Sequence, residues 1–201
     1  MTNSFTHTVS EMRENILSVY RTATAEQIAQ GMEWYSVANA TANAFSQQSG
    51  YSIDQCAAVI AAVSPNNGWG ANKRLAGKVI DARGTKRDGY FKANLDKANR
   101  ILAGEPIEEV LTSQKVGAFY AGIATNGMTD VVCVDRHAYC IAINDRSQTN
   151  DVPMTPKRYA LIAQAYREAA ELIGITGAQC QAITWVVWRN RYWSEGAFDG
   201  K

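Results

Sequence analysis

Hydrophobic residues recur at helical spacing along almost the whole chain of 201 residues, and no stretch alternates between polar and apolar residues for long enough to form a sheet. A Ser or Thr followed three residues later by Gln, the pattern of a capping box, begins three segments, at Thr24, Ser52 and Thr176. We therefore predict an all-α fold of nine or ten helices. Their expected ranges are 9–22, 24–48, 52–63, 71–82, 90–103, 106–111, 116–125, 136–143, 155–173 and 176–191.

The segment that follows Ser52 is expected to lie deepest in the fold, because residues 56–63 are apolar on every side. A loop rich in turn-forming residues, 64–70, separates it from the next helix. A chain of this length can bury a sizeable core, either as one medium domain or as two small lobes.

Charge is unevenly distributed, although it nearly cancels over the chain. There are 20 Lys and Arg against 19 Asp and Glu, which gives a net charge of +1 in an otherwise ordinary globular composition. Residues 71–100 hold nine Lys and Arg but only three Asp, so this segment carries about +6 and the rest about −5. Such asymmetry favours a polyanion bound to one face, and the alternative is a solvated helical face.

The four cysteines are expected to be reduced, buried thiols of a cytoplasmic protein, because they show no CxxC and no paired metal-ligand spacing. With only two histidines, neither a metal site nor another cofactor is expected. The chain has no N-terminal apolar segment typical of secretion and no apolar run near 18 residues, so no membrane span is expected.

Three segments carry the pattern that points to chemistry. They are residues 61–73 (AAVSPNNGWGANK), residues 115–120 (KVGAFY) and residues 132–139 (VCVDRHAY). In the third, an apolar run ends in Asp135 and turns into a helix, whose dipole and free N–H groups stabilise a carboxylate anion. Asp135 could then stabilise a developing cation or accept a proton. The alternative is that Asp135 is only a helix cap and Lys115 only a surface residue.

In this order, the three segments resemble the helix-hairpin-helix DNA glycosylase superfamily, whose fold is that of endonuclease III. The resemblance covers residues 52–145, and the sequence VDRH at 134–137 is its most specific part. It places the catalytic Lys and Asp of the family at Lys115 and Asp135, and it implies a two-lobed, all-α fold. The whole chain, 1–201, would be one glycosylase-like unit, with lobes at 52–125 and at 1–51 plus 126–201.

The sequence departs from the superfamily at two points. The family's hairpin has two glycines just before the Lys, whose backbone amides hold a DNA phosphate, whereas residues 111–114 here read LTSQ. The helix-hairpin-helix is therefore degenerate, and Ser113 and Gln114 would contact a phosphate through their side chains. The C-terminal loop of four cysteines found in many relatives is absent from the sequence, so no iron–sulfur cluster is expected.

These departures, the sequence SPN at 64–66 and the ending QAITWVVWR at 181–189 resemble a divergent, mostly phage-borne branch, the glutamyl/putrescinyl-thymine pyrophosphorylases or amino-acid:DNA transferases. The resemblance implies thymine hypermodification, in which an amine or amino acid displaces pyrophosphate from 5-pyrophosphoryloxymethyl-uracil in DNA. This reaction and base excision both need a base outside the helical stack. The expected partners are therefore DNA and a small amine or amino acid, and the oligomeric state stays open.

On this resemblance, Asp135 deprotonates the incoming amine and Lys115 binds the leaving pyrophosphate or the base. The residues expected to line the base pocket are Ser64, Asn66, Asn67 and Trp69, with Trp69 stacking on the base. The residues expected to contact DNA or phosphate are Asn72, Lys73, Arg74, Ser113, Gln114, Arg136, His137 and Arg189. Trp185 and Trp188, three residues apart, are expected in the core, and for Arg189 a solvated helix end is the alternative.

Two other functions remain open. In a DNA N-glycosylase, Asp135 would stabilise an oxocarbenium-like sugar, and Lys115 could attack C1′ to form a Schiff base. A non-catalytic DNA-binding relative would keep the scaffold and leave the bases unchanged. The base, the amine donor and the preference for single- or double-stranded DNA are not predicted by the sequence.

Overall fold

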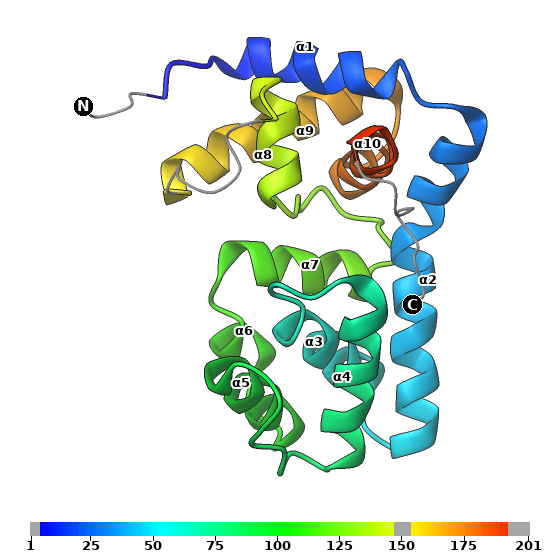
Figure 1. Cartoon of the computed structure of the whole chain (residues 1–201), viewed down its shortest axis with the longest axis vertical. Coiled ribbons are helices and arrows are strands. Elements are labelled where there is room, and N and C mark those ends of the chain that lie inside the picture. The colour runs from blue at the N-terminus through cyan, green and yellow to red at the C-terminus, as the bar shows by residue number, and fades with distance from the viewer. Residues whose placement is uncertain (1–4, 147–153, 193–201) are drawn as a thin grey trace. The chain divides into compact units, whose positions relative to one another are not determined.

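The structure, a computed structural model, describes residues 5–146 and 154–192. Within these ranges it contains ten α-helices and no strand, which confirms the all-α prediction (Figure 1). The helices are α1 (Val9–Tyr20), α2 (Ala25–Ser49), α3 (Ile53–Ala62), α4 (Trp69–Asp81), α5 (Lys92–Leu102), α6 (Ile107–Val110), α7 (Gln114–Ala124), α8 (Arg136–Ile143), α9 (Pro156–Ile173) and α10 (Gly177–Tyr192).

Local capping fixes where several helices begin. The Ser52 hydroxyl accepts a hydrogen bond from the Gln55 backbone N–H at 3.1 Å, and the Gln55 side chain accepts one from the Ser52 N–H, also at 3.1 Å. The same reciprocal bonds form at Thr24 and at Thr176. These pairs satisfy N–H groups that have no partner inside the helix, which explains why the three predicted helix starts lie where they do.

Two helices begin earlier than the sequence predicts. α4 begins at Trp69 instead of residue 71, and α7 begins at Gln114 instead of residue 116. The residues before them, Gly68 and Ser113, make no side-chain cap hydrogen bond, so neither start has the capping box that begins α3. Lys115 therefore lies in the first turn of a helix.

The chain divides into two compact units. Unit 1 contains the described residues up to Trp34 and those from Gly127 onwards, and unit 2 contains residues 35–126. The boundary lies inside α2, whereas the lobes expected from the sequence meet between residues 51 and 52. The second half of α2 belongs to unit 2 because it packs there: the Asn39 side-chain amide donates to the carbonyl of Ile123 at 3.0 Å.

The core of unit 1 is built from α1, α8, α9 and α10, and α1 packs against the other three. Its largest fully buried side chain is Tyr166, and Trp188 is 2% exposed. Burial raises the pKa of the Cys140 thiol to about 11 and that of Cys180 to about 12. All four cysteines of the chain are buried thiols that form no disulfide.

The core of unit 2 is centred on α3, as its apolar surface predicts. Every residue from Cys56 to Val63 is at most 1% exposed. α3 packs against α4, α5 and α7, so three helices cover its sides. No helix in the described part of the chain is long and apolar enough to cross a membrane.

Candidate functional site

Asp135 is the N-cap of α8 in unit 1. Its Oδ1 accepts a hydrogen bond from the backbone N–H of Ala138 at 2.7 Å, and its side chain is half-buried. It makes no ion pair with any described residue. The sequence prediction of a carboxylate at a helix start is confirmed, and one oxygen of this carboxylate also serves as the helix cap.

Tyr159, on α9, holds the chain segment that leads to Asp135. Its hydroxyl donates to the carbonyl of Val132 at 2.8 Å and accepts from the N–H of Val134 at 3.1 Å. Burial raises the pKa of Tyr159, so the hydroxyl keeps the proton that it donates. In a segment without a neighbouring strand, one side chain thus satisfies two buried backbone groups and fixes the residues just before Asp135.

Tyr159→Phe is expected to lower the free energy of unfolding by about 2 kcal/mol, because it leaves the buried Val132 carbonyl and Val134 N–H without a partner. Urea unfolding followed by circular dichroism measures the change. Tyr166→Phe is the comparison variant, because the Tyr166 hydroxyl serves one backbone group, the carbonyl of Ala138 at 3.4 Å, and its other partner is the Thr184 side chain. Equal losses of unfolding free energy in the two variants would show that the two hydrogen bonds of Tyr159 contribute no more to stability than those of Tyr166.

An aromatic and basic cluster lies beside the start of α8 within unit 1. The Trp185 ring meets the His137 ring edge-on, with centroids 6.3 Å apart, and meets the Trp34 ring in the same way at 6.0 Å. The guanidinium carbon of Arg189 lies 5.3 Å from the Trp185 ring centroid, within the range of a cation–π interaction. We call Trp34, His137, Trp185 and Arg189 the Trp185 cluster. The core assignment of Trp188 is confirmed, whereas Trp185 is half-buried and packs at the edge of the core.

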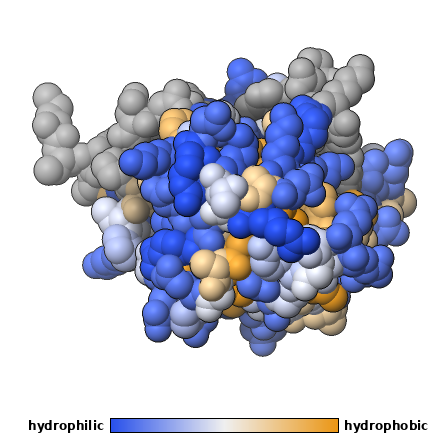
Figure 2. Space-filling model, turned by 90° about the horizontal axis from the view of Figure 1, so that it is seen from below, coloured by the Kyte–Doolittle hydropathy of each residue, from blue (hydrophilic) through white to orange (hydrophobic). Residues whose placement is uncertain are grey.

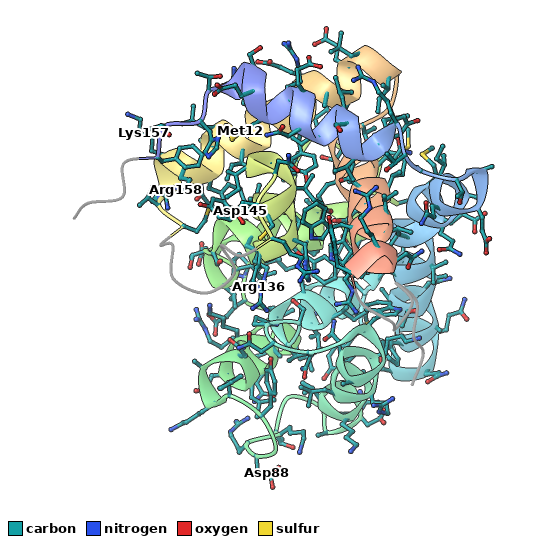
Figure 3. The ribbon with its side chains drawn as sticks, turned by 45° about the horizontal axis from the view of Figure 1, so that its top comes forward. Met12, Asp88, Arg136, Asp145, Lys157 and Arg158 are labelled. Atoms are coloured by element: carbon teal, nitrogen blue, oxygen red, sulfur yellow. The ribbon has the colours of Figure 1, made fainter. Side chains whose placement is uncertain are left out.

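Arg136 is exposed in the first turn of α8, next to Asp135 in the chain. Figure 3 shows it at the start of α8, with Asp145 beyond the other end of that helix. The predicted residues Asp135, Arg136, His137 and Arg189 therefore all belong to unit 1. The other predicted site residues belong to unit 2.

The predicted base-pocket loop lies between α3 and α4 in unit 2. The Ser64 hydroxyl donates to the carbonyl of Ala61 at 2.9 Å, and the Asn67 amide donates to that of Val63, also at 2.9 Å. Both side chains thus cap the end of α3. Asn66 is exposed and adopts a left-handed backbone conformation, with φ of 60°, which asparagine tolerates better than most residues. Of these three, Asn66 is the one whose side chain is exposed.

Two residues at the start of α4 that were predicted to contact DNA, Trp69 and Asn72, are buried. Trp69 is 9% exposed, and the Lys73 ammonium lies 5.4 Å from the centroid of its ring. Asn72 is 1% exposed, and its Oδ1 has no hydrogen-bond partner among the described residues. The predicted contact of Asn72 with a phosphate is therefore not available in this conformation, and Trp69 presents little ring surface for a base. Arg74 is exposed on the same helix.

The residues predicted to form a degenerate hairpin correspond to α6, residues 111–113 and the first turn of α7. Ser113, Gln114 and Lys115 are all exposed there. Because the Ser113 side chain makes no cap hydrogen bond, its hydroxyl is not committed to the helix start. The two predicted phosphate contacts, Ser113 and Gln114, and the predicted catalytic Lys115 lie next to one another at the N-terminus of an α-helix, which favours anions.

The basic segment 71–100 keeps most of its charge uncompensated. Lys86 pairs with Asp88 at 2.7 Å, and Arg100 pairs with Glu105 at 2.6 Å. The other seven basic residues make no ion pair with any described residue. They are Lys73, Arg74, Lys78, Arg83, Arg87, Lys92 and Lys97. Figure 2 looks onto the end of unit 2 that carries the α4–α5 connection, and hydrophilic residues cover most of that face.

Comparison with models of protein families matches residues 1–192 to a family of unknown function, DUF7178. The chain belongs to this family. No curated protein and no solved structure matches the DUF7178 chain. No group of three or more His, Cys, Asp and Glu in the described part of the DUF7178 chain could hold a metal ion.

Sequence reasoning missed two residues at the site of the DUF7178 chain. Tyr159 gave no local signal, because its partners lie 25 and 27 residues away and are brought to it by packing. Trp185 did carry a signal, since Arg189 follows it by four residues, the spacing that places two side chains on one helix face. That pairing identifies a half-buried face of α10.

Proposed function

We propose that the chain is a DNA base-modifying enzyme that transfers an amine or amino acid to 5-pyrophosphoryloxymethyl-uracil. The amine nitrogen attacks the methylene carbon attached to the base, and a C–N bond forms as the C–O bond breaks. Pyrophosphate leaves with the electron pair of that C–O bond. The proton that the nitrogen loses goes to the Asp135 carboxylate, which acts as a general base.

The observation that carries this proposal is the setting of Asp135. Its carboxylate is half-buried, held at a helix start and without an ion pair among the described residues, so it has capacity to accept a proton. His137 follows Asp135 by two residues in the first turn of α8, and its ring meets the Trp185 ring, which the Arg189 cation also approaches. Aromatic rings next to cations suit an unstacked base and its charged substituent.

Lys115 supports a binding role better than a nucleophilic one. Nucleophilic lysines are desolvated in apolar pockets, whereas Lys115 is exposed in the first turn of α7. With Ser113 and Gln114, it offers a cation and polar side chains at a helix N-terminus. This arrangement suits a DNA phosphate, and the exposure of Lys115 disfavours Schiff-base chemistry at C1′.

The deciding experiment incubates the protein with DNA that contains 5-pyrophosphoryloxymethyl-uracil and with a pool of amines and amino acids, followed by mass spectrometry of the nucleosides. The proposal expects an aminomethyl-uracil derivative and free pyrophosphate, with no abasic site. Abasic sites or a borohydride-trapped covalent complex would instead identify a DNA glycosylase. Bound but unchanged DNA, with every candidate amine supplied, would identify a non-catalytic DNA-binding protein.

The basic surface of α4 is expected to bind DNA phosphates. Replacing two exposed cations, Arg74→Gln with Lys78→Gln, should weaken binding and reduce the slope of log K against log salt concentration by about two. Fluorescence anisotropy with labelled DNA, from about 50 to 200 mM salt, measures the slope. The control replaces two exposed cations on α9, Lys157→Gln with Arg167→Gln, and should leave the slope unchanged. An equal effect of both pairs would mean that binding reflects net charge alone.

A further inference from the structure

Unit 2 contains an open cavity that the proposed reaction does not use. It has a volume of about 510 Å³, which lies in the range of small-molecule sites. Its apolar wall comes from the end of α5, from α6 and from the chain on either side of it: Ile101, Pro106, Ile107 and Leu111. Its polar groups are Gln55, Glu105, Glu108 and Tyr120.

Some of these polar side chains already have hydrogen-bond or ion-pair partners in the described part of the protein, and others do not. The Gln55 amide donates to the carbonyl of Ile101 at 3.0 Å, and Glu105 accepts two bonds from Arg100, at 2.6 and 2.8 Å. Those two side chains are therefore already occupied, and the charge of Glu105 is balanced. Glu108 makes no ion pair with any described residue, so its negative charge stays uncompensated at the cavity.

The Tyr120 hydroxyl lines the cavity and lies in the negative electrostatic potential of nearby carboxylates. Its pKa is raised first by burial and then by the charges of Asp54 and Glu108. Asp54 also makes no ion pair with any described residue. Two carboxylates thus act on this hydroxyl, which remains a neutral group whose oxygen can accept a hydrogen bond.

We propose that this cavity binds a small aliphatic ammonium ion, with its alkyl chain against Ile101, Pro106 and Ile107 and its ammonium group at Glu108 and the Tyr120 hydroxyl. An ammonium ion has three donors and no acceptor, which suits a carboxylate and a phenolic oxygen. A phosphate or another anion would be repelled by Glu108 and Asp54. Binding of an ammonium ion in this cavity does not depend on the proposed DNA chemistry.

The experiment titrates the full ¹⁵N-labelled chain with n-butylamine at neutral pH and low salt, and follows the backbone amides by NMR. The matched neutral ligand is 1-butanol, which has the same alkyl chain and no charge. We expect n-butylamine to shift the amides of Gly104, Ile107 and Gly117, which line the cavity, and to bind more tightly than 1-butanol. Equal binding of the two ligands would overturn the proposal, as would shifts confined to other parts of the chain.

Two variants on α6 test the role of the charge. Glu108→Gln is expected to weaken the binding of n-butylamine by about fivefold, the size of an exposed ion pair. Glu109→Gln is the control, because Glu109 is an exposed neighbour that does not line the cavity. Both substitutions change exposed side chains, so both variants are expected to fold. An NMR spectrum that is otherwise unchanged checks this for each variant. Unchanged affinity in Glu108→Gln would overturn the proposal, whereas amine binding without any DNA product would contradict only the proposed function.

Discussion

Asp135→Asn is expected to slow the formation of the modified base by at least about 100-fold, because the amide cannot accept the proton that the amine loses. Asparagine has the same shape, and its side-chain oxygen can still accept the 2.7 Å bond from Ala138 N–H. Asparagine is also as good an N-cap as aspartate. The folded structure and the start of α8 should therefore be preserved while the chemistry is lost. Initial rates, measured by mass spectrometry of nucleosides at saturating DNA and amine, test this result.

Two further variants separate the cap from the base. Asp135→Ala removes both, so we expect the same loss of rate together with a loss of about 1 kcal/mol in the free energy of unfolding. Asp130→Asn is the matched control: its side chain also accepts a backbone bond, from Gly177 N–H at 3.0 Å, and its rate should not change. A normal rate in Asp135→Asn would mean that Asp135 is only a helix cap.

The helices were predictable because their signals are local. Ser52 and Gln55 lie three residues apart, and the bonds between them need no other part of the chain. The starts of α4 and α7 lie two residues before the predicted positions, and neither is fixed by a side-chain cap bond, from Gly68 or from Ser113. There the helix begins where packing holds it: Trp69 is the first residue of α4 and is only 9% exposed.

The candidate site was predictable only where it depends on one helix end. Asp135 follows an apolar run and precedes a helix, so its capping role can be read from neighbouring residues. The two hydrogen bonds from Tyr159 to residues 132 and 134 cannot be read from neighbouring residues, since they form only when α9 packs beside residues 132–134. Asn72 shows that local sequence can also suggest exposure where there is none. A polar residue near a helix start suggests a surface contact, but packing in unit 2 leaves Asn72 only 1% exposed.

Gly31 sets how closely α2 and α10 approach each other in unit 1. A Cβ atom at this position would lie within 3.0 Å of the backbone and the side chain of Ile183. The backbone of α10 cannot move away without shifting the rest of that helix. Trp185 is two residues further along α10, so the same crossing also helps to position the Trp185 cluster.

Gly31→Ala is therefore expected to lower the free energy of unfolding by about 2 kcal/mol, although alanine is the better helix former by about 1 kcal/mol. For a chain of this size the melting temperature should fall by about 4–8 °C, measured by far-UV circular dichroism. Gly77→Ala in α4 is the matched control, because its Cβ would meet only the Phe45 ring, at 3.3 Å, and a ring can shift slightly. There the gain in helix propensity should offset the contact and leave stability nearly unchanged. The two variants differ in what the added Cβ meets: the backbone of α10 at Gly31 and a side-chain ring at Gly77. Equal stability of the two variants would therefore contradict a close backbone crossing at Gly31.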